Sequence, residues 1–318
     1  MSSEQSFCGW VPNPDGVDAY LVNPKNKHPL FGAASSNVAG YDKVDTHLWE
    51  LLIKCSPNYT RGAQLHGDCV SWGCELACTT LIAKQCCKLG SLDLFCEAAT
   101  EPIYGGSRCE IPKITFAGYS DGSYGAAAAE WVRDYGVLLR VDYSAETGNS
   151  EHDLRKYDGN RVKEWGAYGC GGKQDKGMLD AVAKKHPVLT TSLCKSFDEV
   201  AATIAGSKCP VTIASSYGTD MRRNSYGECS WNNSWQHQMV LLGVRFGARP
   251  GAWCCQSWGP NVASGPTGVD TMPENIAGFG WWIPAKDIDK ICSSGDCHSI
   301  GDVDGWEIDP FEWSDLWG

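Results

Sequence analysis

A cysteine that could act as a nucleophile lies in the stretch Gly67–Gly73, which reads Gly-Asp-Cys-Val-Ser-Trp-Gly. A turn of small residues there places Cys69 at the predicted start of a long apolar helix. Unpaired backbone N–H groups and the helix dipole favour the thiolate at this position, and the thiolate is the reactive form of cysteine. Most cysteines in a chain with 17 of them are packing residues or halves of disulfides. Cys69 is therefore a candidate nucleophile that needs a partner base.

Seven histidines could supply that base. His66 precedes Cys69 by three residues and would have to fold back onto the start of the helix. His237 opens the stretch His-Gln-Met-Val-Leu-Leu-Gly-Val, which has the strongest strand pattern in the chain. A side chain at a strand entrance can project into a cleft, although a histidine merely packed at a strand end is the alternative interpretation. His237 is the better candidate.

The elements that must position these two residues follow from hydrophobic periodicity and from turn residues. Helices are expected at 46–54, 69–88, 124–135, 176–185 and 196–206, and strands at 101–106, 137–141, 211–214, 238–244, 253–258 and 280–283. Residues 145–175 are polar and rich in glycine, so a surface excursion is expected there. Because helices come first and strands follow, the sequence predicts an α+β protein. In this arrangement a helical lobe packs on an antiparallel sheet or partial barrel, with a cleft between them.

Three regions are expected along the 318 residues. Residues 1–60 read as an extended arm lying on the body, with Trp10, Tyr20 and Phe31 as isolated apolar anchors. Residues 61–295 form the main domain. Residues 296–318 form a C-terminal tail that interleaves acidic and aromatic side chains, a composition typical of a peptide that docks on its own or a partner's surface.

Composition excludes several kinds of partner. The chain has 27 Lys and Arg against 38 Asp and Glu, a net charge of −11, and no basic run, so neither nucleic acid nor an anionic membrane is expected as a partner. The N-terminus has no secretion signal pattern and no stretch is apolar enough to span a membrane, which predicts a soluble protein, cytoplasmic or part of a virus particle. No Cys-x-x-Cys pair occurs, so neither a metal nor a cofactor is expected.

The order of the candidate residues resembles that of papain-like cysteine peptidases. Those enzymes have a glutamine, a glycine-rich turn, the nucleophilic cysteine on a long central helix, a histidine opening a strand, and then Asn-Ser-Trp-Gly. Here Gln64 precedes Gly67-Asp68-Cys69, His237 opens its strand, and Gln256-Ser257-Trp258-Gly259 stands where Asn-Ser-Trp-Gly is expected.

Further motifs between and after these residues agree with the same family. Asp121-Gly122-Ser123-Tyr124 corresponds to the glycine pair that lines the substrate groove, and Tyr135-Gly136-Val137 to the Tyr-Gly that ends the next helix. Gly278–Pro284 is similar to the Gly-Tyr strand near the end of the sheet. The resemblance covers roughly residues 60–290 and leaves the arm and the tail outside.

The resemblance implies a cysteine peptidase acting on a peptide or protein. Cys69 and His237 would form a thiolate–imidazolium pair that attacks the scissile carbonyl. The other implied roles are Gln64 as oxyanion donor, Gln256 as the acceptor that orients the histidine, Trp258 as a shield over that bond, and Gly122 and Ser123 as groove residues.

Three departures from the family pattern support an alternative. Gln256 replaces an asparagine, and Gln64 lies one residue closer to Cys69 than is usual. Asp68 puts a negative charge beside the thiol and would raise its pKa unless the carboxyl points away. The alternative is a catalytically modified or inactive papain-like protein that serves in a larger assembly, for example as a virion component. Its arm and tail would then contact a protein partner.

Overall fold

The computed structural model describes residues 8–26, 28–33, 40–111, 121–175, 177–270 and 272–303. The helices are α1 (Pro14–Val22), α3 (Trp49–Cys55), α4 (Cys69–Leu89), α5 (Thr100–Cys109), α6 (Gly125–Asp134), α7 (Ser144–Thr147), α8 (Gly159–Tyr168), α9 (Met178–Ala183), α10 (Phe197–Ala201), α11 (Glu274–Ala277) and α12 (Ala285–Ser294). The strands are β1 (Thr46–His47), β2 (Val188–Leu193), β3 (Val211–Arg223), β4 (Cys229–Arg245), β5 (Gly251–Cys255), β6 (Gly280–Pro284) and β7 (His298–Val303).

Helix α4 is the central element, and it begins at Cys69 as predicted. Every residue from Cys69 to Cys87 is buried, because its apolar side chains leave few polar positions. Some of its polar residues are bonded within the helix, since the Thr79 hydroxyl donates to Glu75 and the Thr80 hydroxyl to the Leu76 carbonyl, each at 2.7 Å. Lys84 instead donates to the Ser207 carbonyl outside the helix, at 3.0 Å. Gly90 ends the helix in the left-handed region at φ +68°, which a glycine adopts without steric strain.

The strands form one antiparallel sheet in the order β2-β7-β3-β4-β5-β6, and β1 pairs with β4 at a branch. The long β3–β4 hairpin pairs Val211 with Leu241 and Ser215 with His237 before its register shifts at a bulge. The sheet therefore stays open and does not close into a barrel. Among the predicted strands, those at 211–214, 238–244 and 280–283 lie within β3, β4 and β6.

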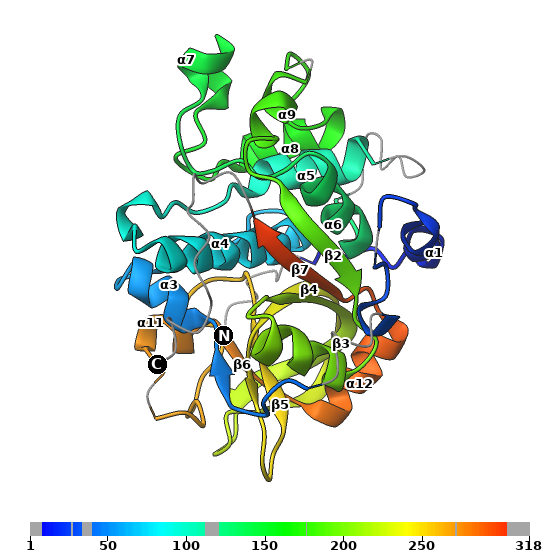
Figure 1. Cartoon of the computed structure of the whole chain (residues 1–318), viewed down its shortest axis with the longest axis vertical. Coiled ribbons are helices and arrows are strands. Elements are labelled where there is room, and N and C mark those ends of the chain that lie inside the picture. The colour runs from blue at the N-terminus through cyan, green and yellow to red at the C-terminus, as the bar shows by residue number, and fades with distance from the viewer. Residues whose placement is uncertain are drawn as a thin grey trace.

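The helices and the sheet gather in two halves, with α4 between them (Figure 1). Helices α5, α6, α8 and α9 lie together in the upper half of the view, and β3–β6 with α12 lie in the lower half. Helix α4 packs against α5 and α6 in one half and against β4 and β7 in the other. The predicted α+β architecture, a helical lobe on an antiparallel sheet, is confirmed.

The strand predicted at 101–106 is wrong, because these residues belong to helix α5. Pro102 falls in the first turn, where a missing N–H costs no helical hydrogen bond. The two glycines allow close helix packing. A Cβ on Gly106 would lie 1.9 Å from the Trp131 indole, and one on Gly105 would lie 2.7 Å from the backbone of Gly169. Tertiary packing, which the local pattern does not reveal, decides this helix.

Three further expectations need correction. Residues 137–141 form no strand, and only Leu139 makes an isolated bridge, to Ala98. The supposed surface excursion at 145–175 contains helix α8, which Asp158 caps through its side chain and which packs against α5. The predicted helix 46–54 begins later, at Trp49, because its first residues pair as β1 with β4.

The predicted arm and tail both reach into the core. Tyr20 and Leu48 have no exposed surface, and Trp10, Phe31 and Trp49 are also buried. Residues 298–303, at the start of the predicted tail, form β7 between β2 and β3 in the sheet. The acidic-aromatic residues 304–318 lie outside the described residues, and so do residues 1–7, 27 and 34–39 of the arm.

Candidate active site

Cys69 is the first residue of α4 and has no exposed surface. Its sulfur accepts a hydrogen bond from the backbone N–H of Gln238 on β4, with an N to Sγ distance of 3.4 Å. Burial raises the pKa of the thiol to about 12, although the N–H groups of Gln238 and Gly9 oppose that rise. In this state Cys69 is a neutral thiol at the meeting point of the two halves.

His237 lies on β4 directly before Gln238, the residue whose N–H contacts the Cys69 sulfur. Its ring is fully buried and stacks on Trp258, with centroids 4.1 Å apart and planes 22° from parallel. Neither ring nitrogen has a hydrogen-bond partner among the described residues. Burial, and then the positive charge of Arg61, lower the pKa of His237 to about 3. The histidine is therefore neutral as well.

The Gln256 side chain bonds within its own turn, and the Gln64 side chain bonds to its own turn and to Ser257 of the Gln256 turn. The Gln256 amide donates to the Gly259 carbonyl at 3.1 Å and accepts from the Trp258 N–H. The Gln64 side-chain amide donates to the His66 carbonyl at 2.7 Å and accepts from the Ser257 hydroxyl. The structure thus brings both glutamines to the site without a hydrogen bond from Gln256 to His237 among the described residues.

Asp68 precedes Cys69 but directs its carboxylate away from the sulfur. One oxygen accepts from the Trp72 indole at 3.1 Å and from the Tyr157 hydroxyl at 2.8 Å. Its other oxygen is buried without a partner among the described residues. Burial raises the pKa of Asp68 to about 7, against the effect of the Tyr157 hydrogen bond. The carboxyl accordingly anchors the start of α4 to its surroundings.

Gly122 and Ser123, which the resemblance implies as groove residues, form one wall around a backbone segment that crosses the site. Gly122 has φ +109°, a conformation that favours glycine, and its N–H donates to the Tyr104 hydroxyl at 3.0 Å. A Cβ on Gly122 would lie 2.7 Å from the carbonyl oxygen of Gly9. Only a glycine lets another backbone come this close.

That other backbone is the segment Cys8–Val11, which lies across the site in extended form. Ser123 donates to the Gly9 carbonyl and accepts from the Val11 N–H, each at 2.8 Å, which is a parallel bridge. On the opposite wall the Gln236 carbonyl accepts from the N–H of Gly9 at 3.0 Å and of Trp10 at 3.1 Å. The segment therefore joins both walls over Cys69, and it accounts for much of the burial of the thiol.

Several residues at the site gave no signal in the sequence. Trp10 was an isolated anchor of the arm, and its indole N–H donates to Asp296 at 3.2 Å. Asp296 and His298 lay in the predicted tail, yet both are buried and 2.7 Å apart. These residues come from opposite ends of the chain, so no local motif could have joined them.

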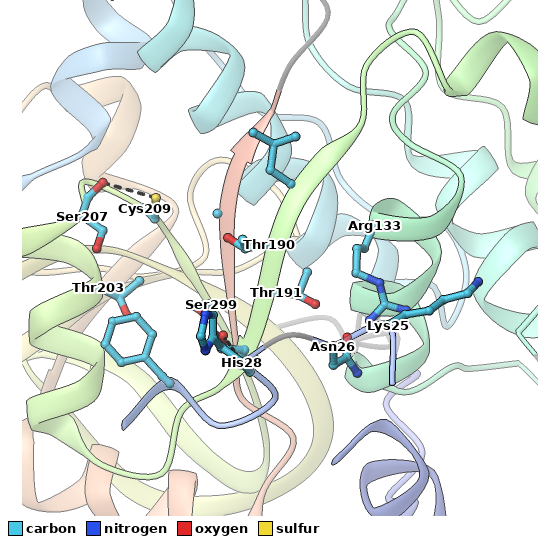
Figure 2. Close-up of a pocket in the computed structure, with 14 residues that line it drawn as sticks. Lys25, Asn26, His28, Arg133, Thr190, Thr191, Thr203, Ser207, Cys209 and Ser299 are labelled. Atoms are coloured by element: carbon cyan, nitrogen blue, oxygen red, sulfur yellow. Dashed lines mark hydrogen bonds between the residues drawn. The ribbon is translucent and has the colours of Figure 1, made fainter. Parts of the chain in front are cut away.

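A separate pocket lies at the β2–β7 edge, away from Cys69 (Figure 2). It has a volume of about 230 Å³, and Lys25, Asn26 and Arg133 lie together on one side of it. Both cations already bond to Asp134, Lys25 at 2.7 Å and Arg133 at 2.9 Å. Across the described residues, no group of three or more His, Cys, Asp or Glu is arranged to hold a metal. None of the described helices combines the length and apolar character needed to cross a bilayer.

Comparison with known proteins identifies the architecture. No protein-family model matches the chain, and no curated protein is significantly similar to it. Xylellain, a cysteine protease from Xylella fastidiosa, superimposes with a TM-score of 0.58 at 16% identity, over 94% of this chain and 97% of its own. The fold is papain-like. A procathepsin B from Trypanosoma congolense gives a TM-score of 0.52 at 10% identity, over 94% and 87% of the two chains.

These low identities describe a divergent papain-like chain, as the motifs predicted. The likeness places α4 and β4 in the same fold as the proteases, with Cys69 and His237 on those elements. The comparisons do not favour the interpretation of an inactive assembly protein, and they give no support for a virion component.

Proposed function

We propose that this protein is a cysteine peptidase that cleaves peptide bonds with Cys69 as nucleophile and His237 as general base and acid. The observation that carries the proposal is the extended segment Cys8–Val11, hydrogen-bonded to both walls over the Cys69 sulfur. A groove that binds one extended backbone through main-chain groups can bind another, because these groups do not depend on side-chain identity. The thiol lies under the bound chain, where a nucleophile must be.

In the reaction, His237 takes the proton of the Cys69 thiol and the sulfur attacks the carbonyl carbon of the substrate. The oxyanion accepts a hydrogen bond from the Cys69 backbone N–H, which is free of helical bonding at the first position of α4. His237 then gives its proton to the leaving amine. Water attacks the thioester, His237 accepts its proton, and the carboxylic acid product leaves while the thiol is restored.

Trp258 positions the base in this mechanism. The stacked indole fixes the plane of the His237 ring, while Gln256 holds the turn that carries Trp258. The role assigned to Gln256 is therefore to orient the histidine through Trp258, and the polar groups of Gln64 hold the neighbouring turn to Ser257. Both glutamines act as positioning residues.

The occupied groove explains why both reacting groups are neutral. Burial disfavours the thiolate and the imidazolium alike, which is why the pKa of Cys69 is about 12 and that of His237 about 3. When Cys8–Val11 leaves the groove, water reaches both groups and the pKa values move toward each other. A thiolate–imidazolium pair can then form.

The test is site-specific labelling of Cys69 with iodoacetamide, followed by peptide mapping because the chain has 17 free cysteines. The full-length chain carrying Trp10→Ala, which loosens the segment over the groove, is compared with the same chain carrying His237→Gln. Labelling of Cys69 near neutral pH is expected to be fast in the chain that retains His237 and slow in the His237→Gln chain. Hydrolysis of casein is expected only from the chain that retains His237. Cys74→Ser, a substitution on the same helix, is the matched control. Equal labelling with and without His237 would exclude the proposed pair.

A further inference from the structure

The side chain of Trp10 fills a pocket in the groove whose floor is a carboxylate. Trp10 is only 7% exposed, and its indole N–H donates to Asp296 at 3.2 Å. The same carboxylate accepts from the backbone N–H of Gly125 and from His298 at 2.7 Å. Asp296 is 2% exposed. A buried acceptor of this kind needs its donors, because a missing hydrogen bond to a desolvated carboxylate is costly.

The pocket is shaped around a flat side chain and closed by residues from distant elements. A Cβ on Gly125 would lie 2.9 Å from the Asp296 carboxyl and 2.7 Å from the Gln238 side chain, so glycine keeps the floor open. Gln238 is also the residue that donates to the Cys69 sulfur. The Trp10 pocket and the nucleophile thus share a wall.

The segment runs parallel to the residue that it pairs with on the first wall, since the bridge between Trp10 and Ser123 is parallel. The Gly9 N–H donates to the Gln236 carbonyl at 3.0 Å, and the Gly9 carbonyl accepts from the Ser123 N–H at 2.8 Å. The main chain of Gly9 is therefore held to both walls beside Cys69, and its N–H opposes the rise in the pKa of that thiol.

We propose that Asp296 determines which side chain this pocket accepts, and that it selects an N–H donor such as the indole of tryptophan. Trp10 is then the chain's own occupant of the specificity pocket, and a peptide bearing tryptophan at the corresponding position competes with it. This inference rests on the proposed function for its biological use. The recognition itself depends only on the pocket, and binding can be measured without catalysis.

The experiment uses the full-length chain with Cys69→Ser and Trp10→Ala, so that the pocket is vacated and no turnover occurs. The probes are the pentapeptide amide Ser-Gly-Trp-Val-Pro and the same peptide with 2-naphthylalanine for tryptophan, which keeps the ring area but lacks the N–H. Calorimetry gives both dissociation constants. The tryptophan peptide is expected to bind about tenfold or more tightly.

Substitution of the carboxylate tests its role. In the same chain, Asp296→Leu is expected to bring the ratio of the two dissociation constants to about one. Asp296→Asn keeps an acceptor oxygen, so this variant is expected to retain most of the preference for the tryptophan peptide. If the Asp296→Leu variant fails to fold, the Asp296→Asn variant still allows the role of the carboxylate to be tested. A ratio near one with Asp296 present would overturn the proposal, and so would a ratio unchanged in Asp296→Leu.

The role of Trp10 as occupant is tested separately with the Cys69→Ser chain that retains Trp10. This chain is expected to bind the tryptophan peptide at least about tenfold more weakly than its Trp10→Ala counterpart. Trp231→Ala is the matched control, since Trp231 makes a comparable indole bond of 3.2 Å, to Asp287, on another part of β4. Equal affinity with and without Trp10 would contradict the inference. If the pocket binds the tryptophan peptide selectively but the chain with Cys69 intact hydrolyses no peptide, only the proposed function is contradicted.

Discussion

His237 and His298 are both fully buried histidines on strands of the same sheet, but their surroundings differ. His298 bonds through Nε2 to Asp296 at 2.7 Å, and its ring meets the edge of Tyr20 with centroids 4.7 Å apart. His237 packs against the rings of Trp235 and Trp258, and both of its nitrogens lack partners in the described part of the chain.

This difference indicates that His298 has a structural role and that His237 has a chemical one. A buried polar group without a partner destabilises the fold, so its presence beside Cys69 indicates that the position serves something other than stability. Asp296 and His298, in contrast, bond to each other, and Asp296 also accepts from the backbone N–H of Gly125. Only Nδ1 of His298 lacks a partner among the described residues. We expect substitutions at the two histidines to have opposite consequences for activity and for stability.

The largest effect is expected for His237→Gln in the Trp10→Ala chain. Loss of a general base lowers kcat/KM by about 10²–10⁴-fold. The midpoint of urea unfolding should change little, because the substitution exchanges one buried polar side chain, whose nitrogens are unbonded, for another. Hydrolysis of a fluorogenic peptide and urea titration check both parts. A His237→Gln variant that lost stability but kept its activity would show that His237 is the structural histidine.

His298→Leu should show the opposite pattern. It leaves Asp296 buried without its partner, which costs about 3–5 kcal/mol of unfolding free energy. The kcat per folded molecule should fall only a few-fold, since His298 bonds to the Asp296 carboxylate of the binding pocket and takes no part in the chemical step. Urea unfolding followed by tryptophan fluorescence measures the loss. Unchanged stability would mean that the Asp296–His298 pair is not a structural element.

Asp68→Asn extends the comparison to an acidic group with a pKa of about 7. Because the folded-state pKa lies above the unfolded value of about 3.8, the protonated carboxyl contributes its full stability below pH ~4, and that stability is lost as pH rises through 7. The shift sets an upper bound of about 4 kcal/mol, which water penetration should reduce to about 2. The asparagine of the variant keeps an acceptor oxygen for Trp72 and Tyr157. Because it does not ionise, the variant should not lose stability as the pH rises. The free energy of unfolding should be measured for both proteins at pH 5 and pH 8. The wild type should lose more of it than the variant between these two values. An equal change in both proteins would argue against a buried, titrating Asp68.

The smallest effect is expected for Gln256→Asn. The shorter amide weakens the bonds to Trp258 and Gly259, but the indole still covers His237, so kcat/KM should fall less than about tenfold. Steady-state kinetics of the variant in the Trp10→Ala background tests this. A gain in activity, or a loss beyond about 100-fold, would indicate that the residue at 256 contacts the histidine directly.

Parts of the fold followed from local pattern. The boundaries of α4 and α6 were predicted closely because their apolar periodicity and terminal glycines are strong signals. Helix α5 was missed because Pro102 and two glycines argue against a helix, and only contact with Trp131 and Gly169 makes them suitable. Strand β7 was missed because its six residues, His-Ser-Ile-Gly-Asp-Val, carry no strong strand pattern, and only pairing with β2 and β3 on either side makes them a strand.

The sequence by itself determined the order of the candidate residues, Gln64, Cys69, His237 and Gln256, and the helix and strand that carry the central two. Such information is local, since it depends on residue type and periodicity along one stretch. Only the tertiary structure decided that Cys8–Val11 lies over Cys69 and that Trp10 meets Asp296, 286 residues away. Contacts at that separation arise from how the two halves pack, and no pattern within either segment encodes them.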